Sequence, residues 1–115
     1  DSYNANPTSM KVSIQSFMKF NKFKKTLILG DMHEIGKNSL IEHEAILNSI
    51  KNIKNLKIFL VGKIFNQLKF DSHKIYFFNE TNELIEYFKK NLITGHTILL
   101  KGSRKINLEK IIPVL

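Results

Sequence analysis

Residues 26–36 read Thr-Leu-Ile-Leu-Gly-Asp-Met-His-Glu-Ile-Gly, a strand-like run that passes directly into a polar loop with a glycine at each end. The run is nearly continuous in apolar side chains, which is typical of a strand buried on both faces of a parallel sheet. Ligands of such sheets collect at the carboxyl ends of the strands. The loop at 30–36 is therefore a candidate functional segment.

Outward from this stretch, strand-like and helical patterns alternate along the chain. Further strands are expected at 57–61, 74–78 and 97–100, and a short helix at 64–68. Apolar residues at helical spacing predict four longer helices, on the stripes Met10, Ile14, Phe17 and Met18; Ile46, Leu47, Ile50 and Ile53; Leu84, Ile85, Phe88 and Leu92; and Leu108, Ile111, Ile112 and Leu115. We therefore expect an α/β fold in a single domain, residues 1–115, with a mostly parallel sheet and helices on both faces.

Four residues are expected to shape helix ends. Asn6 followed by Pro7 favours a helix start, with the asparagine as N-cap and the proline at the first helical position. Thr81 is expected to cap the helix that carries Leu84. Pro113 is expected to shorten or bend the last helix, because proline cannot continue the hydrogen-bond ladder.

Composition limits the classes of function. The chain has 115 residues and no cysteine, which excludes disulfides and thiolate metal sites. No apolar run is long enough to span a membrane, and no signal peptide is recognisable. The sequence starts at Asp1 in a turn-like segment, so we expect it to be part of a longer protein. The net charge of +8 fits either a polyanion-binding patch or a solvated surface, and lysines spread along the whole chain favour the second.

Polar segments at 1–7, 30–36 and 101–104 are the candidates for chemistry. In the first, an Asp can accept hydrogen bonds from a ribose and an Asn can pair with adenine, or both can simply shape a turn. In the second, two carboxylates and a histidine are potential metal ligands, but their spacing matches no ligand signature, and a solvated loop is the alternative. The third, with a glycine, a hydroxyl and two cations, is either a clamp for a carboxylate or phosphate or an ordinary loop.

Two further observations limit these readings. The chain contains no G-x-x-x-x-G-K-[ST] phosphate loop, so it cannot hold ATP phosphates in that way. His43 lies on the apolar stripe of its helix with Ile46 and Leu47, which favours a partly buried structural histidine over a catalytic one.

Taken in order, several segments resemble the C-terminal domain of the Mur ligases. They are Asp-Ser-Tyr-Asn-Ala-Asn-Pro-x-Ser-Met at 1–10, Leu-Gly-Asp-Met-x-Glu-Ile-Gly at 29–36, His43, Val-Gly at 61–62 and Leu-Lys-Gly-Ser-Arg at 100–104. The resemblance covers essentially the full chain, and within the family it is strongest to the members that add D-alanyl-D-alanine. Leu108, where a methionine is familiar, and Pro113 are departures from the pattern.

The resemblance implies a Rossmann-like domain that closes over a nucleotide. An N-terminal domain that holds the UDP-sugar and a central domain that carries most of the ATP and Mg²⁺ contacts are expected outside this chain. ATP would convert UDP-N-acetylmuramoyl-tripeptide to an acyl phosphate, which D-alanyl-D-alanine attacks, in cytoplasmic peptidoglycan precursor synthesis. The isolated domain is expected to be inactive, with no specific nucleic-acid partner and no membrane insertion.

The resemblance also assigns roles by position. Asp1 would contact the ribose of ATP, Tyr3 and Asn4 would lie near the adenine, and Asn6 would support that turn. Asp31 and Glu34 are expected to line the cleft towards the central domain. The incoming amino substrate is expected to meet Lys101, Gly102, Ser103 and Arg104. Of these, Arg104 or Ser103 would contact its carboxylate.

Alternatives remain open at this point. A sister Mur ligase that adds a different amino acid would share the fold and most of the motifs. A small basic module that binds RNA or DNA would show lysines on one face together with exposed aromatic side chains. A regulatory domain could retain the fold without activity.

Overall fold

A computed structural model describes residues 5–33 and 35–115 of the chain. The strands are β1 (Lys25–Gly30), β2 (Leu56–Val61), β3 (Ile75–Phe78) and β4 (Thr97–Lys101). The α-helices are α1 (Pro7–Met18), α2 (Ser39–Ile50), α3 (Lys63–Asn66) and α4 (Thr81–Lys90), and the 3₁₀ segments are η1 (Gly36–Asn38), η2 (Arg104–Ile106) and η3 (Leu108–Val114). The strands predicted from the sequence are confirmed to within one residue at each end.

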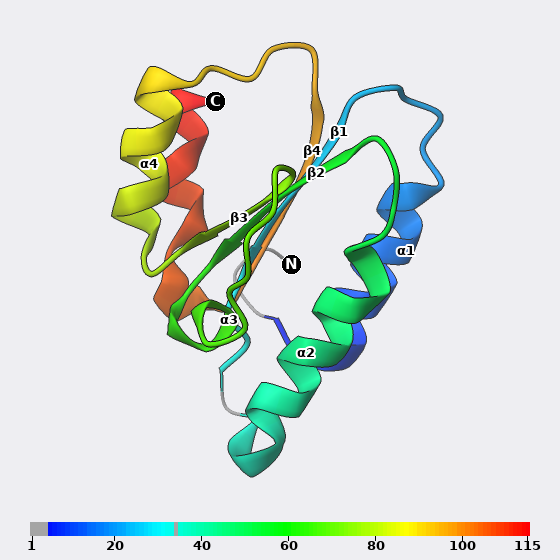
Figure 1. Cartoon of the computed structure of the whole chain (residues 1–115), viewed down its shortest axis with the longest axis vertical. Helices are drawn as coiled ribbons and strands as arrows, with labels where there is room; N and C mark the ends of the chain where they lie inside the picture. The colour runs from blue at the N-terminus through cyan, green and yellow to red at the C-terminus, as the bar shows by residue number, and fades with distance from the viewer. Residues whose placement is uncertain (1–4, 34) are drawn as a thin grey trace.

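The strands form one sheet in the order β3-β2-β1-β4, and every pairing is parallel. β1 lies in the middle, with Lys25 opposite Leu56 of β2 on one side and opposite Thr97 of β4 on the other. The four strands therefore begin at one end of the domain and finish at the other, as Figure 1 shows. The predicted Rossmann-like α/β fold is confirmed.

Helices cover both faces of the sheet, as expected (Figure 1). Side chains alternate along each strand, so Leu27 and Leu29 face α1 and α2, while Ile28 faces α4 and η3. The first cluster centres on Met10, Ile14, Phe17, Leu27, Leu29, Ile46, Ile50, Ile58, Leu60 and Phe65. The second centres on Ile28, Phe59, Val61, Leu84, Phe88, Leu108 and Ile111. Each fully buried large side chain stabilises the fold by about 1.5–3 kcal/mol relative to its exposed form.

The start of α1 confirms the predicted cap. Pro7 is the first helical residue, and the Asn6 side chain accepts a 2.9 Å hydrogen bond from the Ser9 N–H. The Ser9 hydroxyl in turn accepts from the Asn6 N–H at 3.1 Å, so both ends of this turn are satisfied.

The predicted cap of α4 is wrong by one residue. Glu80, not Thr81, is the N-cap, and the Glu83 carboxylate accepts from the Glu80 N–H at 3.1 Å. Thr81 is the first helical residue, and its hydroxyl donates to the Ile106 carbonyl, which ties α4 to η2. The Thr81 side chain therefore bonds a residue 25 positions further along the chain instead of capping the helix.

Three helices are shorter than predicted. α2 ends at Ile50, so Ile53 lies beyond the helix on whose stripe it was expected. α4 ends at Lys90, so Leu92 does not lie on its buried stripe and is 75% exposed. The short helix α3 spans 63–66 instead of 64–68.

The last segment is also different, because η3 is a 3₁₀ helix throughout and contains Pro113. Its buried residues Leu108 and Ile111 are three apart, as a helix of three residues per turn requires. No helix in the described ranges has the length and apolar character that a bilayer crossing needs.

Candidate functional site

All four strands end at one edge of the sheet, which we call the carboxyl edge. It comprises the described residues of the segments that follow β1, β2, β3 and β4, at 31–33 and 35–36, 62–63, 79–80 and 102–104. The sequence-predicted segments 30–36 and 101–104 therefore lie side by side, because β1 and β4 are neighbours in the sheet.

Backbone hydrogen bonds join these loops to one another. The Asp31 N–H donates to the Val61 carbonyl at 2.9 Å, and the Gly62 N–H donates to the Phe78 carbonyl at 2.8 Å. On the other side, the Ser103 N–H donates to the Asp31 carbonyl at 3.0 Å. The carboxyl edge is thus one connected framework.

Asp31 is the hub of this framework. The residue is only 2% exposed, and its two carboxylate oxygens accept 2.9 Å hydrogen bonds from the N–H groups of Ile64 and Phe65 at the start of α3. Gly62 has φ +131°, and a Cβ at this position would overlap the Asp31 carboxylate. The glycine therefore makes room for the aspartate.

No local pattern in the sequence predicts this role of Asp31, which is expected there to line a cleft towards the central domain. Because its carboxylate is held inside the domain, Asp31 acts on the carboxyl edge by fixing α3 and the two adjoining loops. The feature of the sequence that points to this role is Gly62. Gly30 of β1 pairs with Val61 of β2, so the residues that follow them, Asp31 and Gly62, are neighbours.

His43 of α2 supports the loop that follows β1. Its side chain is fully buried, its Nε2 accepts from the Met32 N–H at 2.9 Å, and its Nδ1 lies 2.6 Å from the Ser39 carbonyl oxygen. This arrangement requires a neutral ring protonated at Nδ1. Burial lowers the pKa of His43 and outweighs the Ser39 carbonyl and the nearby Asp31 carboxylate, both of which raise it. The predicted structural histidine is confirmed.

Solvent exposure changes abruptly within the segment 101–104. Lys101 and Ser103 are 3% and 7% exposed, whereas Arg104 is exposed. Gly102 is closely packed, since a Cβ there would lie 2.8 Å from the Gly30 Cα and 2.9 Å from a methyl group of Leu108. Only glycine lets the loop after β4 approach the end of β1 this closely.

Three buried side-chain atoms in the described ranges have no hydrogen-bond partner. They are the His33 Nε2, the Ser39 Oγ and the Ser103 Oγ. Buried polar atoms are nearly always paired, so such a group needs an explanation. All three belong to the loops after β1 and β4 or to the residue that opens α2, which makes the carboxyl edge the place where a ligand or another part of the protein would complete the bonding.

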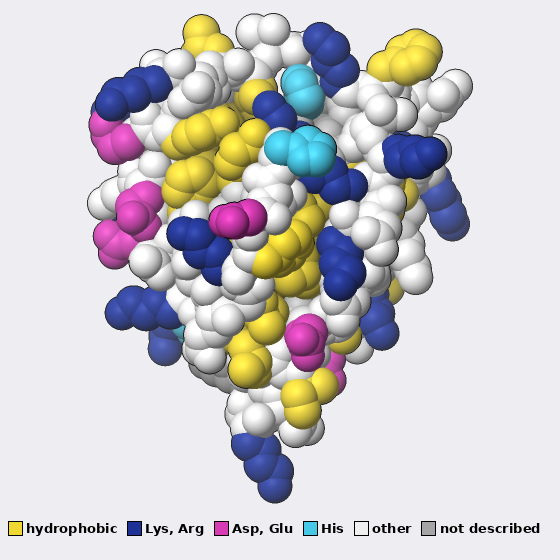
Figure 2. Space-filling model, in the orientation of Figure 1, with side chains coloured by type: hydrophobic (Ala, Val, Ile, Leu, Met, Phe, Trp, Pro, Cys, Tyr) yellow, Lys and Arg dark blue, Asp and Glu magenta, His cyan; other side chains and the backbone are white. Residues whose placement is uncertain are grey.

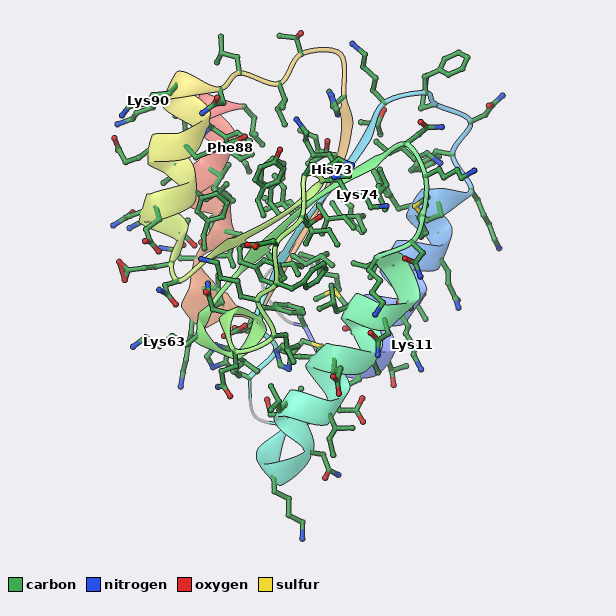
Figure 3. The ribbon with its side chains drawn as sticks, viewed as in Figure 1. Lys11, Lys63, His73, Lys74, Phe88 and Lys90 are labelled. Carbon is green, nitrogen blue, oxygen red and sulfur yellow. The ribbon has the colours of Figure 1, made fainter. Side chains whose placement is uncertain are left out.

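An open groove of about 880 Å³ lies beside this edge. Asn6 and the first residues of α1 line it, together with Glu42 of α2 and Lys101 of β4. Lys11, labelled on α1 in Figure 3, lines the same groove. The groove brings the start of α1 and Lys101 together.

Four of the predicted site residues, Asp1, Tyr3, Asn4 and Glu34, lie outside the described residues. Their assigned contacts with the nucleotide and the cleft stay predictions. Within 5–33 and 35–115, no group of three or more His, Cys, Asp or Glu side chains could hold a metal ion.

Comparison with known proteins adds a family to this geometry. Residues 1–104 match the model of the Mur ligase, glutamate ligase domain. The UDP-N-acetylmuramoyl-tripeptide–D-alanyl-D-alanine ligase of Buchnera aphidicola subsp. Baizongia pistaciae is 35% identical over 100% of this chain and 25% of its own length. The enzyme of the same name from Bacillus subtilis is 35% identical over 97% of this chain and 26% of its length. The chain thus spans about a quarter of these relatives.

Solved structures agree with the fold. MurF from Acinetobacter baumannii superimposes with a TM-score of 0.81 and 27% identity, over 98% of this chain and 26% of that one. A MurF ligase from Thermotoga maritima, solved in complex with ADP, has a TM-score of 0.77 at 23% identity, over 99% of this chain and 26% of that one.

Proposed function

The chain belongs to the Mur ligase family, and we propose that it is the C-terminal domain of a cytoplasmic ligase that uses ATP to join D-alanyl-D-alanine to UDP-N-acetylmuramoyl-tripeptide. Curated relatives that carry this activity in their names match essentially the whole chain at 35% identity. Because the chain spans about a quarter of their length, the proposal assigns the UDP-sugar site and the phosphate chemistry to other parts of the same protein.

The observation that carries the proposal is the arrangement of residues 101–104 at the carboxyl edge. The buried Ser103 Oγ lacks a partner there, and the next residue, Arg104, is exposed. A guanidinium group binds a carboxylate through two parallel hydrogen bonds, and a serine hydroxyl can add a third. D-alanyl-D-alanine carries one carboxylate, which this pair would hold.

Other residues support the pair without touching the substrate. Gly102 allows the close approach to Gly30, and Asp31 accepts the Ser103 N–H through its carbonyl oxygen. We assign Lys101 to the same substrate-facing segment, since it lines the groove beside α1.

For the nucleotide, the proposal relies on the family resemblance. Asp1 is assigned to the ribose of ATP, and Tyr3 and Asn4 to the adenine. Asn6 caps α1 and so holds the end of that turn. The sequence has no phosphate loop, and by the family resemblance the proposal assigns Mg²⁺ and the phosphates mainly to the central domain.

The domain would then act by positioning. Held at the carboxyl edge, the amine of the dipeptide would be oriented towards an acyl phosphate carried by the rest of the enzyme. Orientation of two reactants can supply a large part of the rate enhancement, and closure also excludes the water that would hydrolyse the acyl phosphate. On this basis the isolated domain is inactive.

Kinetics of an Arg104→Ala variant of the full-length ligase test the proposal. Loss of a charge-assisted pair should raise the KM for D-alanyl-D-alanine by about 10- to 100-fold. The KM for ATP should change little, because its contacts lie elsewhere. Lys105→Ala, an exposed cation at the next position, is the matched control and should leave both constants near the parent values. An unchanged dipeptide KM in Arg104→Ala would contradict the assignment.

A further inference from the structure

The end of the domain opposite the carboxyl edge has an unusual charge distribution. We call it the amino end and define it as residues 19–25, 51–57, 69–74 and 89–96, the connections that lead into the four strands. These ranges hold eleven of the 18 basic residues but only one of the 10 acidic ones, Asp71. The rest of the chain is therefore slightly acidic, and the excess positive charge belongs to this end.

In the sequence these lysines are spread widely, which favoured a merely solvated surface. Parallel topology changes that interpretation, because every strand of the sheet begins at the same end. One hollow of about 490 Å³ draws residues from all four connections: Phe23, Lys24, Lys25, Asn55, Leu56, Lys57, Lys74 and His96. Figure 2 shows the dark-blue cations gathered around two histidines in the upper half of the view.

Two of these lysines hold the loops in place. The Lys25 Nζ donates to the Met18 carbonyl at 2.8 Å, and the Lys74 Nζ donates to the Ile53 carbonyl at 2.6 Å. Lys74 is labelled beside His73 in Figure 3. Lys24, Lys57 and His96 line the same hollow, and the pKa of His96 is lowered mainly by burial and further by these two cations.

Apolar side chains project from the same loops. Phe23 is 98% exposed and Phe20 is 57% exposed, both within the segment Lys-Phe-Asn-Lys-Phe-Lys-Lys at 19–25. From other connections, Leu92 is 75% exposed and Phe70 is 43% exposed. Phe20 and Phe70 each keep an edge-on ring contact inside the domain, with Phe17 and Phe77. The nearly fully exposed Phe23 stabilises little in the domain itself, so its ring is the tip most open to a partner.

From this arrangement we propose that the amino end is a docking surface for an anionic lipid bilayer. Lysines near such a surface bind its headgroups, and apolar tips enter the interface. Single-stranded nucleic acid is the competing polyanion, but it favours aromatic platforms along a groove. Three of the four exposed tips here are phenylalanines, which the nucleic-acid alternative also predicts, but the fourth, Leu92, is aliphatic, and the chain's single arginine, Arg104, lies at the opposite edge.

The proposal goes beyond the proposed ligase function and does not depend on it. The substrate-facing residues lie at the carboxyl edge, so a domain docked by its amino end would leave that edge turned away from the bilayer. Docking is peripheral, since the tips are single side chains.

Co-sedimentation of the full-length protein with lipid vesicles tests the proposal. We expect salt-sensitive binding to phosphatidylcholine vesicles that contain phosphatidylglycerol, and none to phosphatidylcholine alone. Phe23→Ser should weaken binding by about tenfold, as expected for burial of one large apolar side chain. Lys22→Glu with Lys24→Glu should weaken it by about 30-fold or more, since each lysine contributes roughly fivefold.

Matched controls change the same chemistry elsewhere. Ile41→Ser replaces an apolar residue that is 66% exposed on α2, and Lys37→Glu with Lys110→Glu reverses two exposed cations outside the amino end. Both controls should bind like the parent.

Absence of binding to the anionic vesicles, or equal losses in the controls, would overturn the proposal. Displacement from the vesicles by a single-stranded oligonucleotide that binds more tightly would also overturn it, in favour of a nucleic-acid partner. Phosphate release by each variant reports separately on the ligase function.

Discussion

Replacing Asp31 by alanine should destabilise the domain strongly, although the residue lies in a loop. The substitution removes two 2.9 Å hydrogen bonds and leaves the N–H groups of Ile64 and Phe65 without acceptors. Hydrogen bonds to charged groups contribute about 1.5–3 kcal/mol each, so the free energy of unfolding should fall by about 3–5 kcal/mol. For a domain of this size the Tm should fall by roughly 10–20 °C.

A second substitution tests the geometry itself. Gly62→Ala places a Cβ on the Asp31 carboxylate and forces alanine into a left-handed conformation at φ +131°. In the Asp31→Ala background the overlap disappears and only the backbone strain remains, about 1–3 kcal/mol. Gly62→Ala should therefore cost at least about 1 kcal/mol less in that background than alone.

Urea unfolding of the 115-residue chain, followed by circular dichroism, gives the four free energies of this cycle. Asp71→Ala, an exposed aspartate in a loop, is the control and should change stability by less than about 0.5 kcal/mol. If Gly62→Ala costs the same in both backgrounds, Asp31 does not lie under Gly62 and the account of the carboxyl edge is wrong.

Two further predictions concern stability. Because burial lowers the pKa of His43 below its ordinary 6.5, the unfolded chain takes up a proton that the folded chain does not as pH falls below 6.5. Stability should then decline, with a slope of up to about 1.4 kcal/mol per pH unit until the folded pKa is reached. His43→Gln should flatten this slope in urea unfolding between neutral and mildly acidic pH, leaving only the share of His96, and an unchanged slope would contradict the assignment. Gly102→Ala should lower stability by about 1–3 kcal/mol, because its Cβ would lie 2.8 Å from the Gly30 Cα, and a Tm equal to that of the parent would show that the two loops are not in contact.

Much of the fold followed from the hydrophobic pattern alone. The four strands are nearly continuous apolar runs, and a parallel sheet buried on both faces requires that pattern. Asn6 and Pro7 gave the start of α1 because a cap is a local property. Thr81 was misplaced because Glu80 and Glu83 form the capping box while the Thr81 hydroxyl bonds the distant Ile106 carbonyl. Leu92 was misplaced because α4 ends at Lys90, where Asn91 donates to the Tyr87 carbonyl.

The site was only partly predictable. The segments at 30–36 and 101–104 were recognisable as loops after strands, and β1–β4 pairing does bring them together. Sequence reasoning could not show that the Asp31 carboxylate turns inward, since its partners lie 33 and 34 residues further along the chain. The gathering of lysines at the amino end was hidden for the same reason, because it depends on where each connection returns to the sheet.

The central claim is that this chain completes a ligase specific for a D-alanyl-D-alanine acceptor. Phosphate release from ATP by the full-length protein tests it most directly, with UDP-N-acetylmuramoyl-tripeptide present and the dipeptide added, omitted or replaced by single amino acids. The account predicts turnover that requires the dipeptide. Turnover with a single amino acid in its place would indicate a sister ligase, and no turnover under any combination would contradict the ligase assignment itself.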